Sequence, residues 1–511
     1  MDINELPDLV LEIIFSHLNQ YGDLENVRLV SRRWHRVAYT VIYILKKSFL
    51  RCNQLIWELH AAEKEGDGAI AKRCSHSSCY HDGTKKVYIF GGCTDNYTAF
   101  NDLWSFNLRT RSWCREFIKC APFPRPKAMS IFLPYKEYLI LHGGFAKSSP
   151  NPIHQAANFF NEMHLYDTIT NEWIEVETEP PPPVIASHCA CVVDDSLIIF
   201  GGSQNSRATN AVYVLDIVNK IWHTPSFVED HKDGNCEKLD ASNEPFLLKG
   251  PQPNPRYGSS CVVIDKSHLL VVGGCGGPNC IYNDAWLLTF DLTLQHAWEW
   301  KQINITNPKL GPSQLWCHPA CPIGRNLACI SYAKKNSGYS AISLNSYPAP
   351  LQVTSKNLIQ LPLRPGNNAM LQPSCTRNNM DPTLNERLNS SGCQPSTSSL
   401  RVKNSLKYGN SVPGTTMGNF RKYWYHRKRL VNACVYILDT SRVLEDCTVT
   451  WRQQEIDLNA PDDTMLYSLC AGRGELIMFG GMRSDMQGDN RHPFTHTISN
   501  DIYILSPARL L

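Results

Sequence analysis

The sequence predicts a mainly β protein in which one four-stranded unit recurs around a ring, preceded by a small all-α domain. Two observations support this fold class. An apolar run that ends in Gly-Gly recurs five times, and residues 1–44 follow a helical pattern instead of a strand pattern. The runs are V-Y-I-F-G-G at 87–92, L-I-L-H-G-G at 139–144, L-I-I-F-G-G at 197–202, L-L-V-V-G-G at 269–274 and L-I-M-F-G-G at 476–481. A pattern that returns as a whole is the signature of a repeat architecture.

Each run is followed by a similar sequel, which in four of the five repeats includes a Trp on the next strand. The sequels are Asn101-Asp102-Leu103-Trp104 with Trp113, Asn161-Glu162-Met163 with Trp173, Asn210-Ala211-Val212-Tyr213 with Trp222, Asn283-Asp284-Ala285-Trp286 with Trp298 and Trp300, and Asn500-Asp501-Ile502-Tyr503. The apolar runs suit strands buried on both faces. Paired glycines suit a turn with positive φ that a neighbouring backbone approaches closely. The alternative, a β-sandwich with glycine turns, gives no reason for the whole pattern to recur.

This pattern resembles the kelch repeat, whose period is about 50 residues and whose unit is one blade of a β-propeller. The Gly-Gly pairs begin at 91, 143, 201, 273 and 480, and the last interval is too long for one blade. We therefore expect a six-bladed kelch β-propeller over 73–511, with its fifth blade split by an insertion at 334–423. The expected blades are 73–120, 121–180, 181–228, 250–304, 313–455 and 462–506. The insertion is rich in Ser, Asn and Pro, a composition typical of disorder.

The final blade needs a strand from elsewhere in the chain. The last repeat stops after its Tyr503 strand and lacks the Trp of the other blades. After a linker at 45–52, residues 53–60 have a strand-like pattern in which Trp57 takes the place of that Trp. We expect this strand to close the ring, because closure removes exposed sheet edges at the seam.

The N-terminal region, residues 1–44, has a helical pattern that differs from the rest of the chain. Leu6-Pro7 opens a run in which apolar residues recur at helix spacing, and Ser31 is a candidate N-cap for a later helix. A unit of about 40 residues usually needs a disulfide, a metal or a partner to be stable, and this one contains no Cys. The order and spacing of these residues resemble an F-box, with a helical cap on the propeller as the alternative. The resemblance implies docking on the adaptor Skp1 through Leu6, Pro7, Leu9, Ile13, Leu18, Val30 and Trp34.

Composition argues against several function classes. Charged residues make up 19% of the 511 residues and the net charge is +3, so we expect no membrane partner and no nucleic-acid partner. The 20 Cys include no C-x-x-C pair, and we expect no metal and no cofactor; a metal site at Cys317, His318 and Cys321 is an alternative whose spacing matches no usual zinc pair. We expect a cytoplasmic or nuclear location, because neither a signal peptide nor a long apolar segment is seen. The basic, aromatic stretch 421–429 reads as an import signal or as a solvated flank.

The combination resembles the F-box/kelch-repeat family. This resemblance implies the substrate-recognition subunit of an SCF (Skp1–cullin–F-box) E3 ubiquitin ligase. The F-box would bind Skp1, and through it the cullin-1 and RING subunits, while the propeller captures the protein to be ubiquitinated and degraded. We expect no catalysis by the chain itself, because no nucleophile with its base, P-loop or H-E-x-x-H motif is present. A kelch scaffold or cytoskeletal protein, and a copper oxidase on a kelch-like propeller, are the alternatives.

Topology predicts which propeller face binds the substrate. If the strands of a blade are called a to d, the b–c and d–a connections emerge on one face and the a–b and c–d connections on the other. The long segments 145–158, 229–250 and 334–423 all belong to the b–c and d–a face, and long loops often carry function. We expect substrate contacts there from Arg73, Lys127, Arg256 and Trp316, with solvated rim charges as the alternative. The strand at 53–60 begins on the opposite face, where we expect the F-box.

Overall fold

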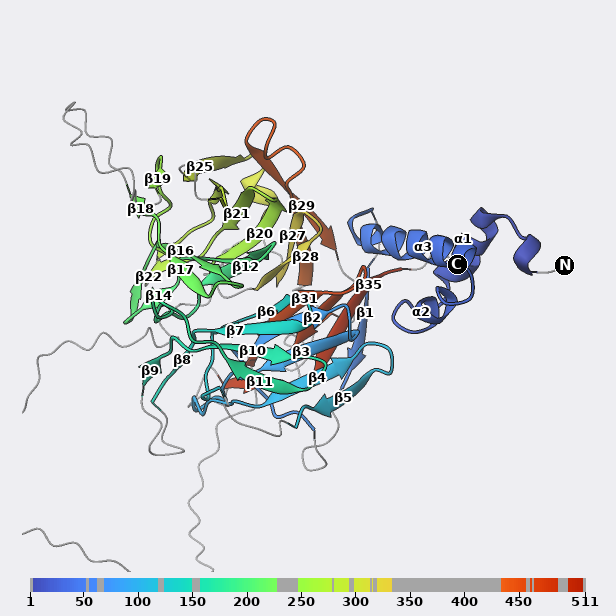
Figure 1. The fold of residues 1–511 in the computed structure, drawn as a ribbon, viewed down its shortest axis with the longest axis horizontal. Helices are drawn as coiled ribbons and strands as arrows, with labels where there is room; N and C mark the ends of the chain where they lie inside the picture. Colours follow the sequence, from blue (N-terminus) through green and yellow to red (C-terminus); the bar gives the residue numbers. More distant parts are fainter. Residues whose placement is uncertain are drawn as a thin grey trace, which may run out of the picture. The chain divides into compact units, whose positions relative to one another are not determined.

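The computed structural model of the chain describes residues 3–51, 55–61, 69–117, 124–148, 157–227, 247–277, 280–293, 298–312, 315, 319–332, 433–455, 460–461, 464–485 and 495–508. The expected insertion at 334–423 and the basic stretch at 421–429 lie outside these residues. Trp316, Cys317 and His318 also lie outside them. The described part contains an N-terminal helical region followed by antiparallel sheets (Figure 1).

The helical region consists of a short 3₁₀ turn η1 (Ile3–Glu5) and three helices, α1 (Asp8–Ser16), α2 (Asp23–Val27) and α3 (Arg32–Arg51). Pro7 directly precedes the first helical residue of α1. The Ser31 hydroxyl accepts a hydrogen bond from the Trp34 amide at 3.1 Å, which caps α3 as the sequence predicts. The helices share a small core of Leu11, Phe15, Leu24, Val37, Ala38, Val41 and Ile42.

In the described residues, six four-stranded units follow, each with its strands in meander order. The first two contain β2 (Ser77–His81), β3 (Lys86–Phe90), β4 (Leu103–Asn107) and β5 (Ser112–Arg115), then β6 (Ile131–Tyr135), β7 (Tyr138–His142), β10 (Met163–Asp167) and β11 (Glu172–Glu175). The third and fourth contain β12 (Cys189–Val193), β13 (Ser196–Phe200), β16 (Val212–Asp216) and β17 (Ile221–His223), then β20 (Ser260–Asp265), β21 (His268–Val272), β24 (Ala285–Thr289) and β25 (Trp298–Ile305). The fifth contains β26 (Ala320–Ile323), β27 (Asn326–Tyr332), β28 (Ala433–Asp439) and β29 (Thr448–Glu455). These units confirm the predicted fold class, a mainly β propeller after a helical region.

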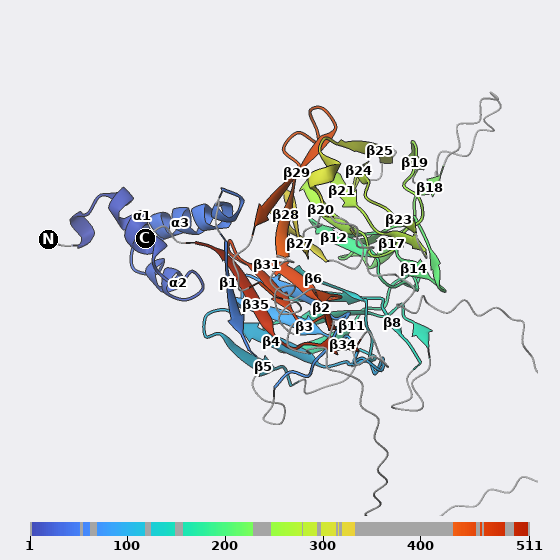
Figure 2. The same ribbon diagram turned by 180° about the vertical axis from the view of Figure 1, so that it is seen from behind.

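The sixth unit combines both ends of the chain. It contains β31 (Ser468–Ala471), β32 (Leu476–Phe479), β35 (Ile502–Pro507) and β1 (Leu55–His60), and β1 pairs antiparallel with β35 from Leu55↔Pro507 to His60↔Ile502. The blue β1 lies beside the red β35 in Figures 1 and 2. Trp57 is buried there, and its ring meets that of Tyr503 edge-on, 5.9 Å between centroids. The N-terminal strand therefore completes a blade built otherwise from the last residues of the chain.

The b–c and d–a connections contain short additional strands. They are β8 (Phe145–Ala146), β9 (Asn158–Phe159), β14 (Ser203–Gln204), β15 (Arg207–Ala208), β18 (Ser226–Phe227), β19 (Leu247–Lys249), β22 (Cys275–Gly277), β23 (Cys280–Ile281), β30 (Thr464–Met465), β33 (Met482–Asp485) and β34 (Thr495–Ile498). A 3₁₀ turn, η2 (Pro308–Leu310), follows β25. A short parallel pairing of β25 with β29 joins the fourth and fifth units directly, at Asn304↔Thr448 and Ile305↔Val449.

The Gly-Gly pairs hold neighbouring blades together. In the first pair, the Gly92 amide donates to the Lys127 carbonyl of the next blade at 3.0 Å. Gly91 has φ 65°, and a Cβ on it would lie 2.4 Å from that same carbonyl oxygen. Only glycine accepts both the positive φ and this approach. The same contact recurs at the other four Gly-Gly pairs, which explains why the pairs repeat in the sequence.

A second set of backbone hydrogen bonds links successive blades just before each a strand. The amides of Ser75, Met129, Ser187 and Gly258 donate to the carbonyls of Leu466, Ser75, Met129 and Ser187, respectively, at 2.7–2.9 Å. Each of these donors has a positive φ between 54° and 65°. The segments that enter the a strands are therefore fixed relative to one another, and so are the loops around them.

Candidate binding surfaces

The helical region presents an uncovered apolar face. In α1, Leu11 and Phe15 lie four residues apart and face the core, whereas Leu9 and Ile13 lie on another side and are 68% and 56% exposed. Val30, beyond α2, is 60% exposed. Isolated exposed apolar residues are ordinary, but a group of them on one small domain marks an interaction site.

The seven residues predicted to bind Skp1 divide into two sets. Leu9, Ile13, Val30 and Pro7 are exposed and available to a partner. Leu6, Leu18 and Trp34 are partly buried and pack against the core of the helical region itself. For this second set the structure shows an intramolecular role, because the short helices need these side chains to cover their own core.

Sequence reasoning left exposed apolar residues of α1, and one just after α2, out of the predicted site. Val10 and Ile14 of α1, and Leu29 after α2, are all exposed. The helical spacing could have identified two of them, because Val10 and Ile14 are four residues apart, as Leu9 and Ile13 are, and therefore lie next to each other on the helix. We define the Leu9 face as the exposed apolar residues Leu9, Val10, Ile13, Ile14, Leu29 and Val30.

The cations predicted to contact a substrate are buried instead. Arg73 is fully buried, and its two terminal nitrogens donate to the Asp102 carboxylate at 2.6 and 2.9 Å. Arg256 repeats this arrangement with Asp284, at 2.6 and 3.0 Å. Lys127, also fully buried, pairs with Glu162 at 2.7 Å. The geometry therefore contradicts both a direct substrate contact and a solvated rim charge at these three positions.

The repeat pattern explains why these three cations are buried. In the first, second and fourth repeats, an acidic residue in the sequel to the Gly-Gly run pairs with the buried cation. The indole N–H groups of Trp104 and Trp286 donate to Asp102 and Asp284 at 2.7 and 2.8 Å. Burial alone would raise the pKa of Asp102, but the hydrogen bonds from Arg73 outweigh burial and hold the pKa below its usual value. These charged pairs stabilise the blades. The fourth predicted contact, Trp316, lies outside the described residues.

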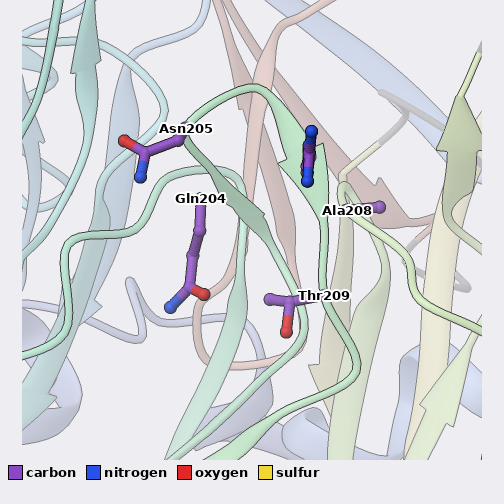
Figure 3. A pocket seen from close by; sticks show the side chains of 5 residues that line it. Gln204, Asn205, Ala208 and Thr209 are labelled. Carbon is purple, nitrogen blue, oxygen red and sulfur yellow. The ribbon is translucent and has the colours of Figure 1, made fainter.

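The b–c and d–a face carries small hairpins around the ends of the blades. One of them, β14–β15 in the third blade, has an open, polar hollow of about 530 Å³ lined by Gln204, Asn205, Arg207, Ala208 and Thr209 (Figure 3). Asn205 and Ser206 at its tip have positive φ. The hollow offers amide, hydroxyl and guanidinium groups, which suits a polar segment of a protein partner.

Two further observations bear on chemistry. Within the described ranges, no group of three or more His, Cys, Asp or Glu side chains could hold a metal ion. Among the same residues, no helix is long and apolar enough to cross a membrane.

Comparison with known proteins agrees with this architecture. Residues 3–51 match a family model described as F-box-like, and residues 73–298 match a model described as the FBX42 β-propeller domain. The stretches 273–279 and 315–321 carry a resemblance to F-box only protein 42 in the sequence alone.

Curated relatives are similar to part of the chain at low identity. Kelch domain-containing protein 1 of Mus musculus is 25% identical over 289 residues, which cover 52% of this chain and 62% of that protein. The Homo sapiens protein of the same name is 26% identical over 287 residues, with the same coverage. Leucine-zipper-like transcriptional regulator 1 of Pongo abelii is 27% identical over 274 residues, which cover 45% of this chain and 31% of that protein. The chain thus spans less than two thirds of the length of these relatives.

Proposed function

We propose that this chain, an F-box/kelch protein with an F-box-like domain and a propeller of the FBX42 type, is the substrate-recognition subunit of an SCF E3 ubiquitin ligase. The F-box-like domain binds Skp1, and through it the cullin-1 and RING subunits. The propeller holds the protein to be ubiquitinated. The chain performs no covalent chemistry; it contributes proximity and orientation to an enzyme that carries ubiquitin.

The observation that carries this proposal is the Leu9 face. A small domain whose core is complete, but which still exposes the apolar side chains of the Leu9 face, is suited to a stable protein partner. The aliphatic character of the face suits burial against the apolar surface of an adaptor.

Topology supports a division of labour between the two propeller faces. The helical region contacts turns of the a–b and c–d type: the β2–β3 turn at Lys85, the β4–β5 turn at Arg111 and the β31–β32 turn at Arg473. The b–c and d–a face, with its hairpins and the polar hollow at β14–β15, is left for the substrate. Skp1 and the substrate then bind at different ends of the receptor.

Affinity purification of the tagged chain from cells with cullin neddylation inhibited tests the proposal. We expect Skp1 and cullin-1 to co-purify, and substrates to accumulate because they are captured but not ubiquitinated. Partners that require the b–c and d–a face should be lost when the β14–β15 hairpin is replaced by a short Gly turn, whereas Skp1 should remain. A scaffold or a copper oxidase has no need of Skp1, so its absence from the purified wild-type chain would refute the proposal.

A further inference from the structure

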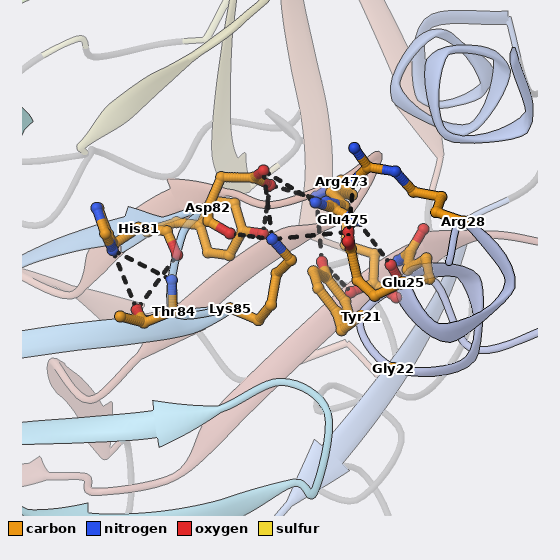
Figure 4. A network of polar contacts seen from close by, with 12 residues as sticks. Tyr21, Gly22, Glu25, Arg28, His81, Asp82, Thr84, Lys85, Arg473 and Glu475 are labelled. Carbon is orange, nitrogen blue, oxygen red and sulfur yellow. Dashed lines mark hydrogen bonds and ion pairs between the residues drawn. The ribbon is translucent and has the colours of Figure 1, made fainter. Parts of the chain in front are cut away.

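A cluster of polar side chains joins the F-box-like domain to two blades of the propeller (Figure 4). We define the Arg473 cluster as Tyr21, Glu25, Asp82, Arg473 and Glu475. Tyr21 lies just before α2 and Glu25 lies within it. Asp82 belongs to the β2–β3 turn of the first blade, and Arg473 and Glu475 belong to the β31–β32 turn of the sixth. These two blades flank the seam that β1 closes.

Arg473 stands at the centre of this cluster and is 3% exposed. Its Nε and one Nη donate to the two carboxylate oxygens of Asp82 at 2.8 and 2.9 Å. Its other Nη donates to the Gln20 carbonyl at 3.0 Å and to the Glu25 carboxylate. One guanidinium therefore binds the propeller with one edge and the F-box-like domain with the other, a geometry that a lysine cannot reproduce.

Tyr21 provides a second connection beside the first. Its hydroxyl donates to Glu475 at 2.9 Å and accepts from the Arg473 backbone amide at 3.1 Å, and the side chain is buried. Burial, together with the nearby Glu475 charge, raises the pKa of Tyr21 well above its usual value, which keeps the hydroxyl protonated as a donor. Burial would raise the pKa of Asp82, but the Arg473 hydrogen bonds outweigh it and lower the pKa, so this carboxylate stays charged.

The backbones fit as closely as the side chains. A Cβ on Gly472 would lie 2.4 Å from the Tyr21 hydroxyl, and a Cβ on Gly474 would lie 2.1 Å from the Leu45 carbonyl oxygen of α3. Phe49, near the end of α3, is fully buried with Leu55 and Trp57 in a core that the fifth and sixth blades share. The domain thus touches the propeller through α2 and, separately, through α3.

We propose that Arg473 is a positioning residue that locks the F-box-like domain onto the sixth and first blades, so that the receptor holds its substrate at a fixed orientation to the ubiquitin-charged enzyme. Contacts through α2 and α3 together prevent rotation about the covalent connection between α3 and β1. This inference rests on the proposed function for its consequence in ubiquitination, where geometry decides which lysines come within reach. The lock itself is a property of the free chain.

The first readout is hydrogen exchange of the full chain. Glu25→Arg places a second cation against Arg473 from the F-box side and leaves the Arg473–Asp82 pair of the propeller intact. Breaking a buried charged network of this kind should speed exchange at the backbone amides of residues 21–27 by about 100-fold. Arg473→Ala should do the same, while the matched control Arg442→Ala, at a side chain that is 69% exposed and pairs only with Asp446 among the described residues, should change nothing there.

The second readout is ubiquitination. In a ligase reconstituted with Skp1, cullin-1 and the RING subunit, the chain's own lysines serve as substrate, and mass spectrometry maps the modified ones. We expect Glu25→Arg to bind Skp1 as the wild-type chain does but to spread modification over more lysines. Unchanged exchange together with an unchanged lysine pattern would overturn the lock. If the wild-type chain does not bind Skp1, the proposed function fails, and the exchange measurement still decides whether Arg473 holds the domain.

Discussion

Truncation of Trp57 to Ala tests how β1 closes the propeller. Trp57 is 4% exposed and lies in a cluster with Phe49, Leu55, Tyr503 and Leu505 from both ends of the chain. Loss of such a side chain from a core typically costs about 3–5 kcal/mol of unfolding free energy. The indole N–H of Trp57 finds no acceptor among the described residues, so its polar group contributes little to this figure.

Two control variants on the same residue and strand separate packing from other effects. Trp57→Phe keeps most of the apolar volume and removes the unpaired N–H, so it should cost much less than Trp57→Ala. Ile56→Ala changes a neighbour that is 42% exposed on the other face of β1, and it should cost little. Denaturant unfolding followed by the fluorescence of the remaining tryptophans measures all three. Equal losses for Trp57→Ala and Ile56→Ala would refute the role of β1 as a closing strand.

Three further perturbations test other parts of the account. Leu9→Asp with Ile13→Asp should abolish Skp1 binding in a pull-down and leave the propeller melting transition in place; retained binding would exclude the Leu9 face as the docking site. Arg256→Ala leaves a buried carboxylate without its cation and should lower the free energy of unfolding by about 3–5 kcal/mol in denaturant unfolding. The control Lys266→Ala, at a side chain that is 82% exposed, should leave stability nearly unchanged. Similar losses of unfolding free energy for the two variants would argue against a structural role for the buried pair. Burial lowers the pKa of His188 from 6.5 to about 3. Because the unfolded chain takes up a proton between pH 6.5 and 5 that the folded chain does not, the unfolding free energy should fall by about 1.6 kcal/mol for this residue over that interval. His188→Gln should show a correspondingly shallower fall, and an equal slope would be the contrary result.

The fold class was accessible from sequence because its determinants are local and repeated. Each Gly-Gly run marks a place where the next blade's backbone lies against the glycine, as Gly91 does against Lys127. The strand period and the aromatic sequels recur with it. Five copies of one physical constraint leave little freedom in the architecture, even where the fifth unit lacks the glycine pair.

The binding surfaces were harder to predict from the sequence, because the burial of a side chain depends on partners far away in the sequence. Arg73 lies in a connecting segment and looks available, but the carboxylate that takes it up lies 29 residues further along the chain. Leu9 and Trp34 both match the F-box pattern, yet only the packing of three helices shows that one is exposed and the other partly covered. The Arg473 cluster gives no sequence signal at all, since it joins residues separated by about 390 to 450 positions.

The most direct test of the central proposal is a calorimetric titration of purified Skp1 into the full chain. We expect one-to-one binding with a negative heat-capacity change, because the Leu9 face is apolar and becomes buried in the complex. The variant with Leu9→Asp and Ile13→Asp should give no binding signal at the same concentrations. A wild-type chain that releases no heat with Skp1 at several temperatures, or a variant that binds as the wild type does, would contradict the account.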